Sequence, residues 1–340
     1  MQNEIVSPLP LHDAGGRLTR PGWARSPLFE YRRNRVKARS FRIKEWDYYC
    51  VLNETFGAAF TIADNGYMGF ISVTVFDFEK PGEETRTIMT PFPLGRFNMP
   101  ESSTSGDVIY RDKKNELTFL KGEGTREIAV RFEDFIPGET LEGRILLREP
   151  SRQESMVIAT PFPRAPRAFY YNQKINCLPA YGELKLGSRT LGFSGAPAFG
   201  VLDWGRGVWT YSNTWYWGSG SGLAQGIPFG FNIGYGFGDT SAATENMVFY
   251  DGKAHKLEDV TFHIPDTGYM DPWQFSSSDG RFEMDFTPIL DRSSNTNVLI
   301  IQSAQHQVFG RFSGFAVLDD GKKIEVDNFL GFAEKVMNRW

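Results

Sequence analysis

The sequence predicts an all-β protein that folds as two consecutive antiparallel barrels or barrel-like sandwiches. Three observations predict this class: hairpin turn signals, runs of alternating apolar residues between them, and a high content of aromatic residues and glycine. Aromatic residues make up 15% of the 340 residues, and many of the 35 glycines lie between 182 and 238. Aromatic side chains favour pleated surfaces, and glycines let strands bend sharply. A chain of this length has room for two domains.

The turn signals are Asn-Gly and Asp-Gly pairs, which tolerate the positive φ angles of type I′ hairpin turns. Four such pairs separate apolar runs: Asn65-Gly66, Asp251-Gly252, Asp279-Gly280 and Asp320-Gly321. We expect strands at 58–64, 67–78, 245–250, 255–264, 273–277, 281–286, 298–302, 307–318 and 322–328. Helical periodicity is best at 29–39 and at 332–338, and the second segment suits a last strand equally well.

Proline and glycine are dense between 161 and 200, which predicts a domain boundary near residue 175. We therefore expect an N-terminal arm over 1–44, one β domain over 45–175 and a second β domain over 176–340. Strands could be exchanged across that boundary.

The arm is basic, whereas the rest of the chain is acidic. Residues 1–44 hold ten Lys/Arg and three Asp/Glu, which gives a net charge of +7. Because the whole chain carries −4, the remaining residues carry −11. The basic run over 32–44 is interleaved with apolar residues such as Phe29 and Phe41. The preferred interpretation is that the arm packs on the acidic body. The alternative is a weak contact of residues 32–44 with an anionic membrane.

Several classes of protein have no support in the sequence. The N-terminus lacks the features of a secretory signal, and no apolar run is long enough to span a membrane, so we expect a cytoplasmic protein. Cys50 and Cys177 are then expected to be reduced and buried. The glycine-rich runs 218–222 and 234–238 are not followed by Lys-Ser/Thr, and the four histidines lack metal-ligand spacing. We predict no cofactor, no metal and no nucleic-acid partner; the oligomeric state is left open.

The segment 200–246 carries the strongest signal for a binding site. Side chains alternate between the faces of a strand, so Trp209, Tyr211, Asn213, Trp215 and Trp217 would share one face. A wall of large rings with a few hydrogen-bonding groups suits an apolar ligand. The predicted binding residues are Trp204, Trp209, Tyr211, Asn213, Trp215, Trp217, Asn232, Tyr235 and Asn246. The candidate catalytic residues are Asp203, Arg206, Glu245 and His306.

Structural roles compete with these assignments. The rings could simply fill a wide barrel, with nearby polar groups serving the Trp and Tyr side chains. Asp203 and Arg206 could form a structural ion pair. His306 could be a pocket acid or base, or a histidine satisfied in the core.

The motifs GVLDWGRGVW, NTWYWGSGSG, FGFNIGYGFGD, TENMVFYDGKAHKL and QVFGRFSG, with the closing GFAEKVMNRW, resemble the bacterial family called domain of unknown function 2804, from about residue 12 to the end. More distantly, the chain is similar to tandem-lipocalin proteins that include carotenoid hydratase (hydroxyneurosporene synthase) and tocopherol cyclase. That resemblance implies two lipocalin-like (calycin) barrels with a ligand pocket near their interface. Asp203-Trp204-Gly205 and Trp215-Tyr216-Trp217-Gly218 match the relatives' characteristic stretch loosely, without its His-Asn.

Two functions follow as hypotheses. In the first, the protein hydrates, dehydrates or cyclises an isoprenoid or other lipid-like molecule. Asp203 would give the proton, and the Trp rings would stabilise a carbocation. In the second, the protein carries a hydrophobic ligand without changing it, and the carboxylates are structural. A carbohydrate-active β protein is a third and more distant interpretation.

Overall fold

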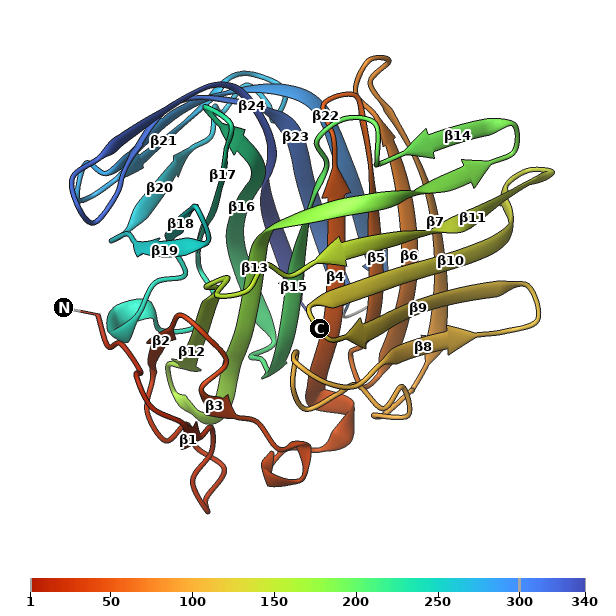
Figure 1. The fold of residues 1–340 in the computed structure, drawn as a ribbon. Helices are drawn as coiled ribbons and strands as arrows, with labels where there is room; N and C mark the ends of the chain where they lie inside the picture. Colours follow the sequence, from red (N-terminus) through yellow and green to blue (C-terminus); the bar gives the residue numbers. More distant parts are fainter. Residues whose placement is uncertain (1, 299–300, 340) are drawn as a thin grey trace.

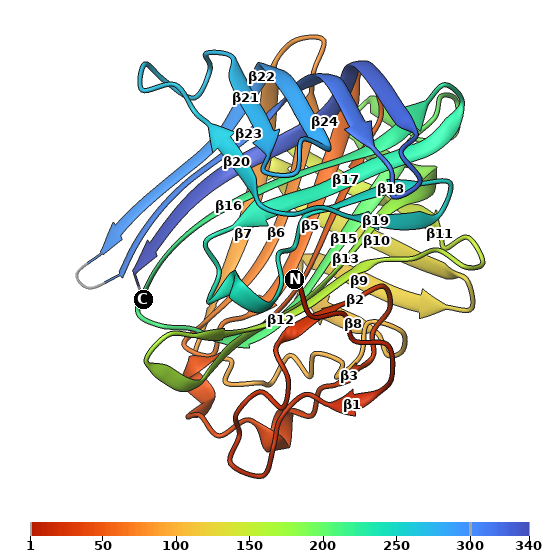
Figure 2. The ribbon, with the colours of Figure 1, turned by 90° about the vertical axis from the view of Figure 1, so that its left-hand side faces the viewer.

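The computed structural model describes residues 2–298 and 301–339. Its regular secondary structure is almost entirely β-strand, and the strands form two large curled sheets, which face each other as half-barrels (Figures 1 and 2). The predicted class of two consecutive lipocalin-like antiparallel barrels is confirmed. No helix among the described residues is both long and apolar enough to cross a membrane.

The first sheet has the strand order β7-β6-β5-β4-β15-β13-β11-β10-β9-β8, with β12 and β14 paired to β13 and β2 paired to β12. Its strands are β2 Gly22–Ala24, β4 Ile43–Leu52, β5 Phe56–Asp64, β6 Met68–Asp77, β7 Gly82–Pro91, β8 Val108–Arg111, β9 Asn115–Gly122, β10 Thr125–Ile136, β11 Glu139–Arg148, β12 Met156–Phe162, β13 Ala165–Leu186, β14 Arg189–Gly192 and β15 Phe199–Val208.

The second sheet has the order β19-β18-β17-β16-β24-β23-β22-β21-β20. Its strands are β16 Ser212–Ala224, β17 Ile227–Tyr235, β18 Met247–Tyr250, β19 Lys253–Lys256, β20 Val260–His263, β21 Trp273–Ser277, β22 Phe282–Val298, β23 Ile301–Val317 and β24 Lys323–Arg339. The segment 332–338 is therefore strand, as part of β24, whereas the predicted run 255–264 is divided between β19 and β20. The predicted strand 298–302 includes residues 299–300, which lie outside the described residues.

The hairpin turns follow the predicted positions, but only one has the predicted geometry. Asp251 and Gly252 both have positive φ, at 50° and 78°, as a type I′ turn requires. At the other three turns only the glycine is left-handed: Gly66 at 80°, Gly280 at 66° and Gly321 at 85°.

Strand β13 couples the two sheets. It is bulged between Ile175 and Leu178, and Cys177 has a φ of 58°. At the bulge the Asn176 side chain donates hydrogen bonds to Ser219 Oγ (2.8 Å) and to the Phe231 carbonyl (3.0 Å) in the second sheet. Both cysteines are buried and free.

The sheet change does not coincide with the predicted domain boundary. Residue 175 falls inside β13, and β15 is paired between β13 and β4 in the first sheet. The chain enters the second sheet between Val208 and Ser212. The proline- and glycine-rich signal between 161 and 200 marks the bends of β13 and the β14 hairpin instead.

The N-terminal arm runs beneath the first sheet (Figure 1). It contains β1 Leu9–Pro10, β3 Phe29–Glu30 and the 3₁₀ turns η1 Arg33–Arg35 and η2 Ser40–Arg42; another 3₁₀ turn, η3, spans Thr240–Ala242. The predicted helix over 29–39 is reduced to the single turn η1. Arm residues Ile5, Leu11 and Tyr31 are buried in the core cluster of the first sheet. Apolar packing, rather than the basic charge, is what attaches most of the arm.

Candidate functional site

A cavity of about 680 Å³ lies between the two sheets. We call it the inter-sheet cavity. Its walls come from β4–β7, β13 and β15 of the first sheet and from β16 and β22–β24 of the second, with Trp209, Phe237 and Glu245 from connecting segments. Lining residues Thr87 and Met89 on β7 and Thr296 on β22 are exposed, so the cavity opens to solvent between these two strands.

One wall of the cavity is aromatic. The Trp209 ring lies 5.3 Å from Trp46 and 6.0 Å from Trp215, measured between ring centroids. Phe237 packs against Trp209 at 4.7 Å and against Tyr170 at 4.6 Å. The sequence motif placed Trp209 and Trp215 here, but Trp46 and Tyr170 come from distant strands that only the sheet brings alongside.

Two glycines of the GVLDWGRG motif make room for this wall. On β15 the Asp203 side chain lines the cavity, and positions 205 and 207, both glycine, are directed to the same side of the sheet. A Cβ at Gly205 would overlap the Trp46 ring, and one at Gly207 would lie 2.6 Å from Trp209 Nε1. Glycine is required at both positions because the indoles lie directly on the strand backbone.

Asp203 forms a buried ion pair with Lys174 at the cavity wall. Its Oδ2 lies 3.0 Å from Lys174 Nζ, and its Oδ1 accepts a hydrogen bond of 2.6 Å from Asn172 Nδ2. Lys174 Nζ also sits 3.7 Å from the centroid of the Trp217 ring, in cation–π contact. The alternative of a structural ion pair holds for Asp203 with a different partner: its cation is Lys174 of the neighbouring strand and not Arg206.

Glu334 on β24 is a lining carboxyl that the sequence interpretation missed. Its Oε1 accepts a hydrogen bond of 3.0 Å from Trp215 Nε1, and its Oε2 accepts one of 3.2 Å from Gln307 Nε2. Burial raises its pKa from the ordinary value of 4.5 to about 7, although the bond from Trp215 and the charge of Lys174 oppose the shift. The only sequence signal was a Glu that alternates with Phe332 and Val336 in the largely apolar run GFAEKVMN.

Glu245 also lines the cavity, and burial raises its pKa above the ordinary range, against the lowering effect of Lys174. Asn232 lies behind it. The Asn232 amide donates to the Glu245 carbonyl (2.8 Å) and accepts from Trp217 Nε1 (2.7 Å). Asn232 therefore orients Trp217 without lining the cavity itself.

Trp204 and Arg206 lie on the opposite face of β15 from the cavity, because they alternate with Asp203. Arg206 is completely buried, 3.1 Å from Asp47 and 3.8 Å from Glu45. It also stacks on Trp204, with its guanidinium carbon 4.0 Å from the ring. These residues hold β15 against β4 and do not line the inter-sheet cavity, as the predicted binding and catalytic roles would require.

Tyr211 and Asn213 also lie outside the cavity lining. Tyr211 precedes β16, in the irregular connection 209–211, and is half exposed. Asn213 is the second residue of β16 and is bonded back to Thr210.

Three further predicted residues have other surroundings. Tyr235 stacks on Tyr216 at 4.5 Å. Asn246 accepts from the Gly234 amide and donates to the Glu258 carbonyl, which is a structural role. His306 stacks on Tyr269 at 3.8 Å and lies 2.7 Å from Asp291, on the other face of β23 from the lining residue Gln307.

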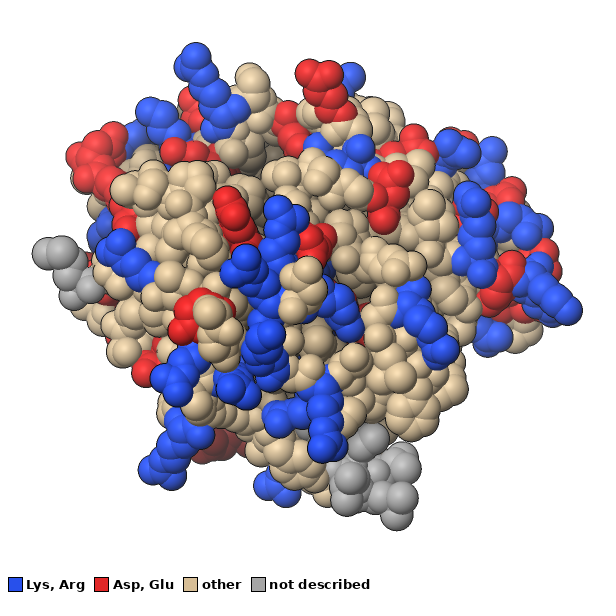
Figure 3. All heavy atoms as spheres, turned by 90° about the horizontal axis from the view of Figure 1, so that it is seen from below, with Lys and Arg blue, Asp and Glu red and all other residues tan. Residues whose placement is uncertain are grey.

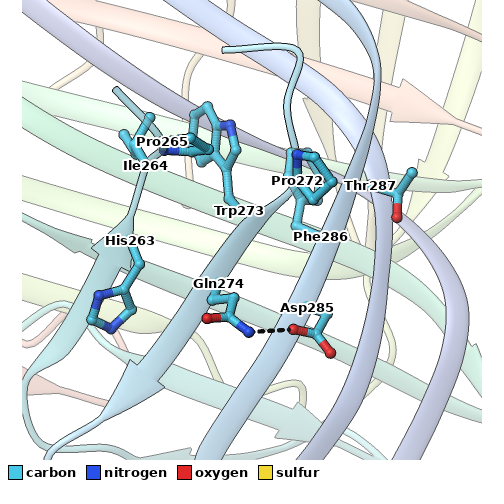
Figure 4. Close-up of a pocket in the computed structure, with 9 residues that line it drawn as sticks. All are labelled: His263, Ile264, Pro265, Pro272, Trp273, Gln274, Asp285, Phe286 and Thr287. Atoms are coloured by element: carbon cyan, nitrogen blue, oxygen red, sulfur yellow. Dashed lines mark hydrogen bonds between the residues drawn. The ribbon is translucent and has the colours of Figure 1, made fainter. Parts of the chain in front are cut away.

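A second hollow, of about 550 Å³, lies on the outer face of the second sheet (Figure 4). His263, Gln274 and Asp285 lie in a row across β20, β21 and β22, and Gln274 donates a hydrogen bond of 3.0 Å to Asp285. All three are exposed, and none of the predicted site residues lines this hollow. Across residues 2–298 and 301–339, no group of three or more His, Cys, Asp or Glu side chains is placed to hold a metal ion.

The fold and the inter-sheet cavity define a tandem lipocalin-like protein with its ligand-sized space between the two half-barrels. The chain belongs to the family described as domain of unknown function (DUF2804), whose model matches residues 2–340, and this confirms the resemblance seen in the sequence. No curated protein matches the sequence.

Solved structures share the fold at low sequence identity. CghA with Sch210972 is 11% identical, with 88% of this chain and 89% of that chain covered and a TM-score of 0.52. Kievitone hydratase from Nectria haematococca is also 11% identical, with 87% and 88% covered and a TM-score of 0.52. A putative AttH from Nitrosomonas europaea is 13% identical, with 90% and 96% covered and a TM-score of 0.51. At these identities the likeness concerns the fold.

Proposed function

We propose that this protein binds an apolar, isoprenoid- or lipid-like molecule in the inter-sheet cavity and hydrates, dehydrates or cyclises it by acid chemistry. The observation that carries the proposal is Glu334, a buried carboxyl beside the Trp wall with a pKa of about 7. A carboxyl with such a pKa is partly protonated at neutral pH and can give its proton to an alkene, a hydroxyl or a carbonyl of the ligand.

The aromatic wall supports the same chemistry. Protonation of an alkene or loss of a hydroxyl leaves a carbocation, which the π faces of Trp46, Trp209 and Trp215 would stabilise. Among the similar folds, kievitone hydratase is by its name a hydratase, which supports the reaction class at the level of fold analogy.

Asp203 is the weaker candidate for the acid. Its carboxylate is already paired with Lys174 through one oxygen and accepts from Asn172 through the other, so neither oxygen is directed at a ligand. We assign to Asp203 the role of holding Lys174 in place. Glu245 is a second buried carboxyl, and we assign to it the binding and orientation of a water.

The alternative function is a carrier of a hydrophobic ligand. It is favoured by the engagement of the lining carboxyls, since Asp203 is ion-paired and both oxygens of Glu334 accept hydrogen bonds. In a carrier these groups would serve only to satisfy the buried Lys174, Trp215 and Gln307.

Native purification, solvent extraction and mass spectrometry of the bound molecule separate the two functions. The wild type and Glu334→Gln are compared, with Glu325→Gln, an exposed position on the same strand, as the matched control. If Glu334 is the acid catalyst, the Glu334→Gln protein should retain a bound molecule that differs from the molecule bound to the wild type by one water or in chromatographic retention. The same molecule in all three proteins would establish a carrier and rule out the acid role.

Occupation of the cavity is tested by tryptophan fluorescence with farnesol or oleate as the probe. A response is expected, because four of the eight tryptophans (Trp46, Trp209, Trp215 and Trp217) line the cavity. Trp215→Ala should abolish it, and Trp273→Phe, in the separate core of the second sheet, should preserve it. A response that survives Trp215→Ala would place the probe elsewhere.

A further inference from the structure

Large apolar side chains gather on the surface at one end of the inter-sheet cavity. We define the mouth patch as Phe41, Met89, Phe92 and Leu94, whose exposed fractions are 43%, 63%, 60% and 42%. Met89 belongs to both the mouth patch and the cavity lining. The adjoining Tyr67 and Met68 belong to the lining only. The mouth patch therefore continues the apolar surface of the cavity to the outside.

Backbone contacts hold the patch together around the turn at Gly66. The Phe92 amide donates to the Tyr67 carbonyl (2.9 Å), and the Leu94 amide donates to the Gly66 carbonyl (3.1 Å). The backbone of Phe41 lies against Gly66 so closely that a Cβ there would come within 2.5 Å of it. Three segments distant in sequence thus present their apolar side chains at one place.

The conformation of this loop is unfavourable for its residues. Phe92 has a φ of 48° and Leu94 a φ of 56°, in the left-handed region that bulky residues rarely occupy. Glycine or asparagine would adopt these angles more easily, and neither side chain is buried as compensation. Residues held in strained conformations cluster at functional sites, and here the strained residues direct apolar groups outward.

Basic side chains lie beside the mouth patch and along the arm segment that leads to Phe41. Exposed Arg39 precedes Phe41 in sequence, exposed Arg42 donates a hydrogen bond of 2.6 Å to the carbonyl of Trp209, and exposed Arg96 donates to the Phe92 carbonyl. Arg35 and Lys37 are also exposed, and none of these five cations forms an ion pair within residues 2–298 and 301–339. Seen from below, Lys and Arg side chains gather in the middle of the face that the arm covers (Figure 3).

We propose that the mouth patch and its basic rim dock this protein on an anionic lipid bilayer, so that the ligand passes from the bilayer directly into the inter-sheet cavity. The proposal rests on the proposed function, because it assumes that the cavity takes an apolar ligand. Phe and Leu side chains would enter the headgroup region while unpaired Arg and Lys meet anionic lipid, the combination that interfacial proteins use. Charge complementarity selects an anionic rather than a neutral surface.

Vesicle co-sedimentation tests the docking. The intact protein should bind phosphatidylcholine vesicles that contain about a quarter phosphatidylglycerol, and bind pure phosphatidylcholine at least about tenfold more weakly. Phe92→Asn with Leu94→Asn should lower binding to anionic vesicles about tenfold or more, and these substitutions suit the left-handed backbone, so the melting temperature should not fall. Lys37→Gln with Arg39→Gln should reduce the preference for anionic vesicles.

The control is Arg131→Gln with Arg144→Gln, which removes two exposed charges from β10 and β11, away from the mouth patch. The proposal is overturned if this control lowers vesicle binding as much as Lys37→Gln with Arg39→Gln does. It is equally overturned if the protein binds neutral and anionic vesicles alike. It is also overturned if single-stranded DNA binds more tightly than the vesicles and the Phe92/Leu94 variant leaves that binding unchanged, since the rim would then serve nucleic acid.

Failure of docking and failure of the proposed function are distinguishable. Farnesol delivered from solution, without vesicles, reports on the cavity alone through tryptophan fluorescence. A protein that binds farnesol but no vesicles retains the proposed function and loses the docking proposal. One that binds vesicles but gives no fluorescence response has a docking surface without the proposed ligand.

Discussion

At the scale of single residues, the inter-sheet cavity is defined by buried charges whose partners come from other strands. Lys174 and Asp203 face each other across β13 and β15, and Glu334 approaches from the other sheet through its bond with Trp215. A buried charge is tolerated only when it is paired and hydrogen-bonded. The cavity lining therefore combines compensated ion pairs, Lys174–Asp203 and Arg292–Glu83, with two carboxyls, Glu245 and Glu334, whose pKa burial raises.

Asp203→Asn should lower the free energy of unfolding by about 3–5 kcal/mol, because it leaves the buried Lys174 ammonium without its counter-charge. Denaturant melts measure this. Asp203→Asn combined with Lys174→Met should recover part of the loss, since the uncompensated charge is gone. Asp266→Asn at an exposed position is the control. An unchanged unfolding free energy in Asp203→Asn would mean that the ion pair is not structural.

The raised pKa of Glu334 makes both stability and turnover depend on pH. The folded protein holds this proton up to about pH 7, whereas the unfolded chain releases it near its ordinary pKa of 4.5. The stabilisation is therefore full below pH 4.5 and is lost as the pH rises to 7. Relative to Glu334→Gln, the wild type should lose about 3 kcal/mol across this interval.

Urea melts of the wild type and Glu334→Gln at pH 4.5, 6 and 8 check this dependence. If Glu334 is the acid, turnover should also decline above about pH 7, because the deprotonated carboxylate has no proton to give. A constant difference in unfolding free energy between the two proteins at all three pH values would show that Glu334 titrates normally.

At the scale of elements, β15 has different functions on its two faces. On one face, Asp203 lines the cavity, and Gly205 and Gly207 make room for Trp46 and Trp209. On the other face, Trp204 and Arg206 hold the strand against β4, where Arg206 pairs with Asp47. Strand β13 contributes Lys174 to the cavity and then bulges at Cys177 to reach the second sheet. The position of the Trp wall thus depends on close packing of rings on bare backbone.

Gly205→Ala should destabilise the protein by about 1–3 kcal/mol, because the added methyl group overlaps the Trp46 ring and forces it or the strand to move. The farnesol response of the tryptophan fluorescence should weaken at the same time. Gly195→Ala is the matched control, since a Cβ there meets nothing within 4 Å and its φ is not left-handed. Equal melting temperatures and equal responses for the two variants would contradict the packing argument.

At the scale of the whole molecule, the two half-barrels are held by apolar contacts between the sheets and by the arm beneath the first sheet. Phe309 of β23 packs on Phe76 of β6 at 4.3 Å, and Trp217 packs on Tyr48 at 5.9 Å, so rings of one sheet fill gaps in the other. The arm adds Tyr31, whose hydroxyl donates to Glu45 (2.9 Å). Each sheet curls over a core of its own, and mixed clusters of rings such as Phe76 with Phe309 join the two sheets.

Removal of residues 1–42 should yield an insoluble protein or one that melts much lower, because it uncovers the side chains on which Ile5, Leu11, Phe29 and Tyr31 pack. Neutralising Lys37 and Arg39 within the intact arm should leave the melting temperature unchanged, since both are exposed and outside the ion pairs of the described chain. Differential scanning calorimetry compares the two. A truncated protein with the wild-type melting temperature would show that the arm is only attached to the body and does not stabilise it.

Local sequence determined the class of this protein. Asp-Gly and Asn-Gly turns, alternating apolar runs and clustered glycines are set by short-range backbone preferences, so they predicted the strands, the hairpins and the Trp-rich wall at Trp215 and Trp217. Tertiary structure alone decided which polar groups meet. Asp203 pairs with Lys174, 29 positions earlier, and Trp215 donates a hydrogen bond to Glu334, 119 positions later. Sheet pairing is what places these residues side by side. The pKa of Glu334 likewise depends on burial by both sheets. A lone glutamate in a strand carries no local sign of that burial, since desolvation is a property of everything packed around it.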